Sequence, residues 1–175
     1  IGRISLGVIA TALGIYFLTG FSYSERSETF VTPAMLSGLA PPAGHSYIYP
    51  NKCPLNLNCF KDFDKGLAHA RKVNKPIMLD FTGHGCVNCR KMEDQVWSKD
   101  EIYDILNDEY VVISLYVDER KELDEPYESA FDKDTARTVG DKWSDFQAIH
   151  FNRNTQPFYV LMDTDKKVLN QPRAY

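Results

Sequence analysis

The chain has 175 residues, which is enough for one domain of ordinary size with additional segments at its ends. Hydrophobic residues make up 43% and aromatic residues 13% of the sequence, and this composition favours a packed globular core. The net charge is −4 and no run of lysine and arginine occurs, so the composition argues against nucleic acid as a partner.

The chain begins with an apolar stretch. Residues 4–21 carry no charge, and their number is close to the minimum for a membrane-spanning helix. We therefore predict a transmembrane helix over residues 1–21, with Arg3 on its cytoplasmic side. A cleaved signal peptide and a buried soluble helix are the alternatives, although no small-residue cleavage site follows Phe21.

A segment without a clear period comes next. Residues 22–59 contain several prolines, glycines and serines, which predicts a linker or an irregular arm laid on a domain. Beyond it, apolar residues recur at helical spacing from Phe63 to Ala70, with Asp62 as a plausible N-cap. The sequence at residues 74–76 ends this predicted helix with a proline.

The central part of the chain alternates between strand and helix patterns. Residues 76–82 predict a buried strand, residues 83–85 a loop, and residues 86–97 a helix. A second short helix is expected over residues 102–106. The β-branched and aromatic run at residues 110–117 predicts a central strand.

The last third begins with a polar and charged stretch. Residues 119–141 are predicted to form an insertion, and residues 142–150 a helix. A strand over residues 158–162, a turn over residues 163–166 and a final short strand over residues 167–169 complete the order. No internal repeat is found.

Two cysteines carry the clearest chemical signal. Cys86 and Cys89 are separated by two residues where the predicted strand and loop lead into a helix. Cys86 would lie at the helix N-terminus, where the backbone dipole favours its thiolate, and a charged His84 would favour the thiolate further. Cys89, one turn along, would be buried and could attack a mixed disulfide formed on Cys86.

This motif has other interpretations. A Cys-x-x-Cys alone can bind zinc or an iron–sulfur cluster, or form a structural disulfide. On a strand–loop–helix it indicates a redox dithiol, so no organic cofactor and no metal are expected. Cys53 and Cys59 form a second pair, for which a structural disulfide, free thiols and a second redox pair are all open.

The order of elements resembles the thioredoxin fold, an α/β fold in which helices flank a central mixed sheet. Asp80 lies six positions before Cys86, where thioredoxins keep a buried acid, and Pro157 falls where they have a cis-proline facing the cysteines. The stretch over residues 60–118, centred on FTGHGCVNCRKME, looks like the C-terminal domain of DsbD-type thiol:disulfide interchange proteins. The resemblance to the thioredoxin-like domain covers residues 60–175.

The chain departs from the family in several places. Gly85 replaces the tryptophan that precedes the first cysteine in thioredoxins, and Val-Asn replaces Gly-Pro between the cysteines. The sequence ends at Tyr175, where the family continues into a closing C-terminal helix, and it begins with Ile1 rather than methionine. We therefore expect a chain truncated at both ends.

The resemblance also assigns roles to residues around the cysteines. Asp80, otherwise a plain strand-end residue, would take the proton of Cys89 when that sulfur attacks. Glu93, otherwise a solvated glutamate, lies on the same helical face as Cys89 and would modulate the dithiol. Pro157, joined to Gln156 by a cis bond, would line the site that binds an extended substrate.

Together these features predict a protein-disulfide reductase tethered to the bacterial inner membrane, with its thioredoxin-like domain in the periplasm. It would pass electrons from a membrane-embedded dithiol donor to periplasmic thioredoxin-like or disulfide-containing proteins, as in cytochrome c biogenesis. One alternative is a periplasmic disulfide oxidase or isomerase of the same fold. Another is a non-catalytic thioredoxin-like module that binds peptides.

Overall fold

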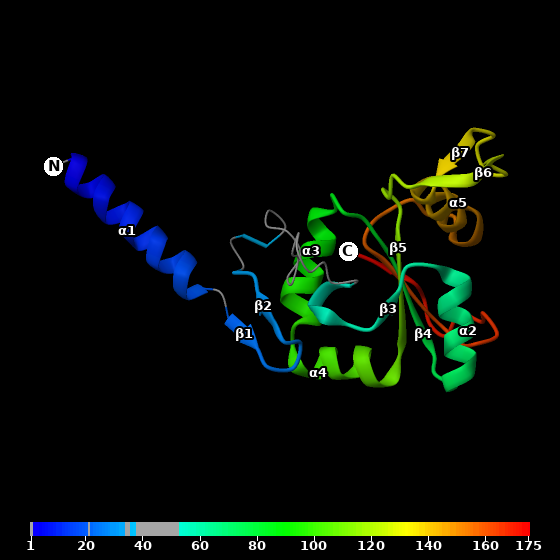
Figure 1. Cartoon of the computed structure of the whole chain (residues 1–175), viewed down its shortest axis with the longest axis horizontal. Helices are drawn as coiled ribbons and strands as arrows, with labels where there is room; N and C mark the ends of the chain where they lie inside the picture. The colour runs from blue at the N-terminus through cyan, green and yellow to red at the C-terminus, as the bar shows by residue number, and fades with distance from the viewer. Residues whose placement is uncertain (1, 21, 34–35, 38–52) are drawn as a thin grey trace.

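The computed structural model describes residues 2–20, 22–33, 36–37 and 53–175. Figure 1 shows a central sheet with helices packed around it, and a long N-terminal helix that extends away from this body. Both chain regions that carry cysteine pairs belong to the body rather than to the extended helix.

Helices and strands alternate along most of the body. The helices are α1 Gly2–Gly20, α2 Phe63–Val73, α3 Val87–Met92, α4 Asp100–Asp104 and α5 Val139–Phe151, with a 3-10 turn η1 Pro54–Asn56 and π-helical turns η2 Glu93–Trp97 and η3 Ile105–Glu109. The strands are β1 Ser22–Ser24, β2 Thr29–Val31, β3 Cys59–Phe60, β4 Ile77–Thr82, β5 Val111–Tyr116, β6 Glu122–Glu128, β7 Thr135–Thr138, β8 Phe158–Met162 and β9 Arg173–Ala174.

The central sheet is mixed, as the sequence predicts. Its order is β3-β5-β4-β8-β9, in which β3, β5 and β4 are parallel and β8 and β9 run antiparallel to their neighbours. In this register Asp80 of β4 lies between Ser114 of β5 and Tyr159 of β8. The buried acid is therefore in the middle of the sheet.

Alternation along β4 divides its side chains between two apolar clusters. Ile77, Leu79 and Phe81 pack against residues of α2 and α5 on one face. Met78 belongs to the cluster on the opposite face, which Trp97 and other residues after α3 complete. Because successive strand residues point to opposite faces, Asp80 and Thr82 lie on the same face as Met78. That face is the one beneath the helix with the Cys-x-x-Cys.

The predicted helix after residue 62 is confirmed. The Asp62 side chain accepts a hydrogen bond from the Lys65 backbone N–H, so it satisfies one of the free donors of the first turn. Asn74 ends the helix in the left-handed conformation, with φ of 51°. A glycine at position 66 lets α2 approach the sheet, since a Cβ there would lie 2.5 Å from the Ile113 side chain.

The strands predicted over residues 76–82, 110–117 and 158–162 are also confirmed, as β4, β5 and β8. The helix predicted over residues 86–97 begins at Val87 but widens into a π-helical turn at Glu93. The second short helix likewise passes into a π-helical turn.

The polar stretch over residues 119–141 differs from the sequence prediction, because it contains the antiparallel hairpin β6–β7. Its side chains are mostly exposed, so the alternation that reveals a half-buried strand is missing. Helix α5 also begins earlier than predicted. Thr138 and Asp141 form a capping box that starts it at Val139.

The predicted final strand over residues 167–169 is wrong. Val168 makes an isolated bridge with Met162, and the strand that closes the sheet edge is β9, five residues later at Arg173. The Asp163 side chain accepts hydrogen bonds from the backbone of Asp165 and Lys167. This turn holds the chain close to β8 without continuing the ladder.

The region predicted to be a linker is more ordered than expected. It contains the hairpin β1–β2, the turn η1 and the edge strand β3, which pairs with β5. Arg26 of the hairpin forms ion pairs with Asp100 and Asp104 of α4, which holds the hairpin against that helix. Residues 38–52 lie outside the described residues.

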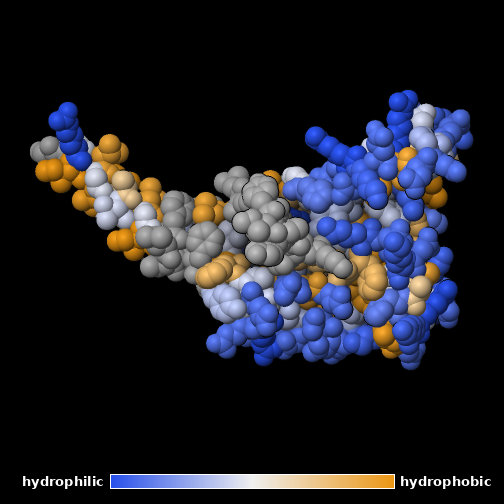
Figure 2. All heavy atoms as spheres, viewed as in Figure 1, coloured by the Kyte–Doolittle hydropathy of each residue, from blue (hydrophilic) through white to orange (hydrophobic). Residues whose placement is uncertain are grey.

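The predicted transmembrane helix over residues 4–21 is not supported. Within the described residues, no helix is both long enough and apolar enough to cross a membrane. Helix α1 does form, and Figure 2 shows apolar side chains along it beside a mostly hydrophilic body.

Candidate functional site

Cys86 and Cys89 form a disulfide at the start of α3. Cys86 is the N-cap residue, and its sulfur accepts a hydrogen bond of 3.1 Å from the Cys89 backbone N–H. Cys86 is half-buried, whereas Cys89 is 1% exposed. The accessible sulfur therefore belongs to the first cysteine and the enclosed sulfur to the second, as the sequence predicts.

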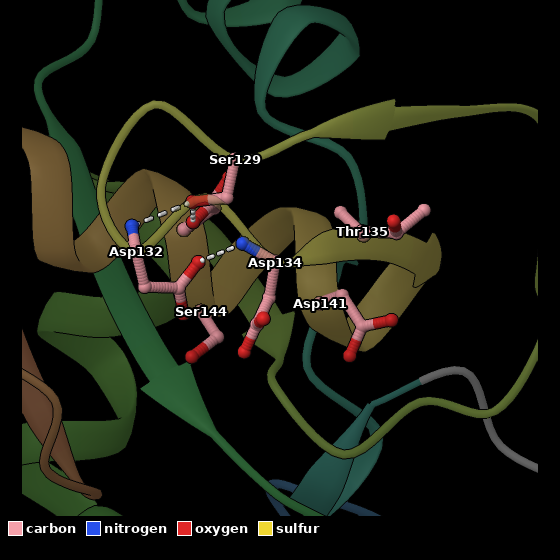
Figure 3. Close-up of a pocket in the computed structure, with 8 residues that line it drawn as sticks. Ser129, Asp132, Asp134, Thr135, Asp141 and Ser144 are labelled. Atoms are coloured by element: carbon pink, nitrogen blue, oxygen red, sulfur yellow. Dashed lines mark hydrogen bonds between the residues drawn. The ribbon is translucent and has the colours of Figure 1, made fainter.

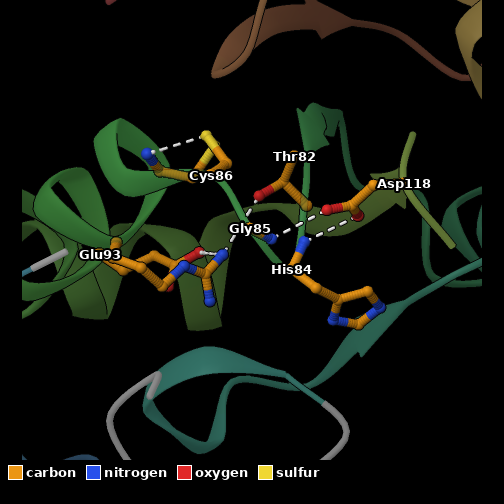
Figure 4. A network of polar contacts seen from close by, with 8 residues as sticks. Thr82, His84, Gly85, Cys86, Glu93 and Asp118 are labelled. Carbon is orange, nitrogen blue, oxygen red and sulfur yellow. Dashed lines mark hydrogen bonds and ion pairs between the residues drawn. A yellow bond between two sulfur atoms is a disulfide. The ribbon is translucent and has the colours of Figure 1, made fainter. Parts of the chain in front are cut away.

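Asp118 fixes the loop that leads into this disulfide. Its two carboxylate oxygens accept hydrogen bonds from the backbone N–H groups of His84 and Gly85, at 2.7 and 2.8 Å (Figure 4). A Cβ on Gly83 would lie 3.0 Å from the same carboxylate, so glycine leaves room for it. The role of Asp118 was not predicted from the sequence. Asp118 follows the central strand β5, and because β5 and β4 are parallel, it lies at the end of the sheet where β4 also ends.

His84 does not act as the sequence suggests. Its ring stacks on Tyr116 with 4.3 Å between ring centroids, and its Nε2 lies 3.3 Å from Glu119 Oε2. Figure 4 shows the imidazole directed away from Cys86. The interpretation of His84 as a charge that stabilises the Cys86 thiolate is therefore wrong, because Glu119 and Tyr116 hold the ring elsewhere.

A cluster of buried charges lies behind the disulfide. Asp80 is 2%, Arg90 4% and Glu93 3% exposed. The Arg90 guanidinium donates from Nη2 to Glu93 Oε1 at 2.6 Å and to Thr82 Oγ1 at 3.3 Å (Figure 4). Arg90 thus joins the helix that carries Cys89 to the strand that carries Asp80. The two acids are predicted from the sequence, whereas the arginine is not.

Burial controls the protonation of both acids. It raises the pKa of the Asp80 carboxyl to about 7, while the Ser114 hydroxyl and the Arg90 guanidinium act in the opposite direction. Burial also raises the pKa of Glu93 well above its usual range, against the attraction of Arg90 and with repulsion from Asp80. Asp80 can therefore gain or lose a proton near neutral pH, as a proton acceptor for a thiol must.

The peptide bond between Gln156 and Pro157 is cis, as predicted. Pro157 is fully buried, and it precedes Phe158, which pairs with Phe81 in the antiparallel ladder. The next position in that register sets Pro157 beside Thr82, at the end of β4 from which the Cys86 loop departs. Gln156 donates a hydrogen bond to the Gln147 side chain of α5. Their roles in substrate binding stay predictions.

Cys53 and Cys59 form the second disulfide. Cys53 is 4% exposed and lies in the apolar cluster with Leu55 and Leu57. Of the three alternatives open from the sequence, the structure contains the structural disulfide. It links the arm to the edge strand β3.

A separate acidic pocket lies at the β6–β7 hairpin, with a volume of about 270 Å³ (Figure 3). Its carboxylates are largely engaged in local structure: Asp141 belongs to the capping box, and Asp145 accepts a 2.5 Å hydrogen bond from Ser129. Among the described residues, no group of three or more His, Cys, Asp or Glu side chains could hold a metal ion.

A mixed sheet, a Cys-x-x-Cys disulfide at a helix start and a cis-proline before the neighbouring strand together define a disulfide oxidoreductase fold of the thioredoxin type. The chain belongs to the thioredoxin-like family, whose model matches residues 58–164. This match covers the whole sheet except β9, and it includes both cysteines of the motif.

Individual proteins resemble the chain over shorter or more divergent stretches. Human spermatogenesis-associated protein 20 is 31% identical over 96 residues, which are 55% of this chain and 11% of that protein. Among solved structures, DsbH oxidoreductase is 19% identical with a TM-score of 0.45, over 75% of this chain and 84% of its own. A disulphide isomerase from Xylella fastidiosa Temecula1 is 18% identical with a TM-score of 0.43, over 62% and 68%.

Proposed function

We propose that the chain is a protein-disulfide reductase of the DsbD type. The observation that carries this proposal is the pairing of an accessible Cys86 with an enclosed Cys89 in front of a buried carboxyl that titrates near neutral pH. This arrangement separates the sulfur that meets a partner from the sulfur that resolves the mixed disulfide.

The exchange proceeds in two steps. The Cys86 thiolate attacks one sulfur of a partner disulfide, the partner S–S bond breaks, and the other partner sulfur leaves as a thiolate. Cys89 then gives its proton to the Asp80 carboxylate and attacks the Cys86 sulfur, which releases the second partner sulfur as a thiolate. The dithiol loses two electrons and the partner disulfide gains them. No cofactor takes part.

The charges around the dithiol support the proposed direction of electron flow. Strong oxidants of this fold class are oxidising because their reduced form is stabilised, with a first thiol of very low pKa. Here Asp80 and Glu93 lie behind the disulfide, and the one imidazole in the loop pairs with Glu119. The buried Arg90 is paired with Glu93, so its charge is offset and adds little stabilisation to a Cys86 thiolate, and a reducing potential is expected.

We also propose that the domain works in the periplasm or another oxidising compartment. The Cys53–Cys59 disulfide supports this, since disulfides persist there and are rare in the cytosol. A reductase in such a compartment needs a supply of electrons. The resemblance to DsbD-type proteins favours a membrane-embedded dithiol as donor and periplasmic thioredoxin-like or disulfide-containing proteins as acceptors.

The potential of the Cys86–Cys89 pair tests the proposal. The protein would be equilibrated with glutathione buffers, and the fraction of each cysteine pair that is oxidised would be mapped by alkylation and mass spectrometry. A value near the roughly −270 mV of thioredoxin is expected, and a value near the roughly −120 mV of strong oxidants would favour the oxidase alternative. The matched control is the Cys53→Ser/Cys59→Ser variant, which should give the same value for Cys86–Cys89.

A further inference from the structure

Arg90 is an unusual residue to find enclosed in a protein. Its side chain is 4% exposed, although arginine is almost never fully buried unless it is paired. It has the Glu93 carboxylate as an ion-pair partner and Thr82 as a hydrogen-bond acceptor, both through Nη2. Its Nε and Nη1 atoms, and Glu93 Oε2, are buried without a hydrogen-bond partner among the described residues.

The groups that face Arg90 come from every element packed around it. Strand β4 contributes Asp80, and the turn η2 contributes Glu93 and Asp94. The hydroxyls of Tyr116 on β5 and Tyr159 on β8 complete the surroundings, and burial raises the pKa of both phenols. The Arg90 guanidinium attracts each of the three carboxyls, and it is therefore their common counter-charge.

The charges in this cluster do not balance when both enclosed acids are ionised. One guanidinium neutralises one carboxylate, and a second carboxylate would leave an uncompensated charge at a site that excludes water. Burial raises the pKa of both carboxyls, and the Asp80 charge raises that of Glu93 further, so the two acids titrate as a coupled pair. Without the guanidinium the favoured state would hold a proton on each acid. Asp80 could then accept nothing from a thiol.

We infer that Arg90 is a positioning residue for proton transfer, whose charge makes it easier for Asp80 to be ionised beside Glu93, so that Asp80 can take the proton of Cys89. This inference rests on the proposed function, because it concerns the second step of the exchange. In that step the proton moves from the Cys89 sulfur to the Asp80 carboxylate, the Cys86–Cys89 bond forms, and the partner thiolate leaves. Asp80 returns its proton to solvent before the next cycle.

Reaction of the reduced protein with 5,5′-dithiobis(2-nitrobenzoate) tests the inference. The first coloured thiolate is released when Cys86 attacks, and the second when Cys89 resolves the mixed disulfide. The rate of the second release would be followed by stopped-flow absorbance as a function of pH. In the wild type it should rise with pH through an inflection near the Asp80 pKa of about 7.

Neutralising the two members of the ion pair should move this inflection in opposite directions. Arg90→Met should raise it by about one pH unit or more and slow the second release about tenfold at neutral pH. Glu93→Gln should lower it, since the Arg90 charge then acts on Asp80 and Asp94 alone. Arg90→Lys, which keeps the charge, should restore most of the rate, and Arg90→Met/Glu93→Gln should return the inflection towards that of the wild type.

The outcomes separate the inference from the function on which it rests. A wild type that fails to release both thiolates would overturn the proposed function and the inference together. Normal release in the wild type with an unmoved inflection in Arg90→Met, or a loss of rate that is equal at all pH values and is not rescued by lysine, would overturn the inference alone. If Arg90→Met does not fold, the double variant is compared with Glu93→Gln. The Arg90→Met change must then raise the pH of the inflection above that of Glu93→Gln alone.

Discussion

The two disulfides of this protein are the same bond in two different settings. Cys53–Cys59 is embedded in an apolar cluster with Leu55 and Leu57. Cys86–Cys89 lies at a helix start, with one sulfur accessible and a set of enclosed charges behind the other. The difference teaches that access and nearby titratable groups, rather than the bond itself, make a disulfide a redox centre.

Exchanging cysteines for serine in each pair is the most severe test of this contrast. Cys86→Ser should lower the rate of disulfide reduction by more than about a thousandfold, because no nucleophile remains. Cys53→Ser/Cys59→Ser should keep the rate within about twofold and lose about 2 kcal/mol of unfolding free energy through the freed loop. Reduction of a model disulfide and urea unfolding measure the two effects. Loss of activity in the Cys53→Ser/Cys59→Ser variant would show that the second disulfide is also needed for the reaction.

Removing the titratable group behind one disulfide sharpens the contrast. Asp80→Asn should slow the second step of the exchange about a hundredfold at neutral pH, and the deficit should shrink at alkaline pH, where Cys89 ionises without help. Stopped-flow release of the second chromophore, as described for Arg90, measures it. An unchanged rate would mean that another group accepts the proton.

The same substitution should alter the pH dependence of stability. The Asp80 pKa is about 7 in the folded protein against the ordinary value of 3.8, so between these values the folded state binds a proton that the unfolded state does not. Its contribution to stability is therefore complete below about pH 4 and is lost as the pH rises through about 7. Urea unfolding should show Asp80→Asn to be more stable than the wild type at alkaline pH, by up to about 4 kcal/mol.

A matched change beside the other disulfide should affect stability without affecting chemistry. Leu55 is fully buried between Cys53 and Cys59, with a left-handed backbone at φ of 54°. Leu55→Ala should lower the unfolding free energy by about 3 kcal/mol through the cavity that it leaves. The potential of the Cys86–Cys89 pair, measured in glutathione buffers, should stay the same. A shifted potential would show that the two settings are coupled.

The smallest effect is expected for the loop anchor. Asp118→Ala removes two hydrogen bonds from the carboxylate to the backbone of His84 and Gly85, which should cost about 1 to 2 kcal/mol of stability. The first step should slow about threefold to tenfold, because Cys86 is then less well placed. Glu119→Gln is the control, since Glu119 contacts the His84 ring rather than the loop backbone. Equal effects of both changes would argue against a specific role for Asp118.

The sequence was sufficient for the parts of the fold that are encoded locally. The apolar run at residues 76–82 and the spacing of Cys86 and Cys89 each specify their own conformation. These local predictions depend on periodicity and on turn chemistry, which a single sequence displays. The site residues Asp80 and Pro157 could be placed because they match the positions of the buried acid and the cis-proline in the thioredoxin fold that the sequence resembles.

The elements that the sequence did not reveal depend on contacts between distant segments. Strands β6 and β7 pair with each other while their side chains stay exposed, so no alternation marks them. The sequence alone suggests a surface position for Arg90, but the packing of α3 on the sheet encloses its side chain. Asp118 can bind the His84 backbone because the parallel strands β4 and β5 end side by side, which the sequence alone does not display.

The π-helical turn after α3 has a consequence for insertions and deletions. At η2 the Ser98 backbone N–H reaches the carbonyl of Glu93, five residues back, so this turn holds one residue more than an α-helical turn. Removing one residue from the turn would restore a regular helix, but it would rotate everything upstream by about 100° relative to everything downstream. We expect such a deletion to preserve helicity while turning Cys89 and Arg90 away from β4. The length of this segment thus sets the angular phase between the redox motif and the sheet.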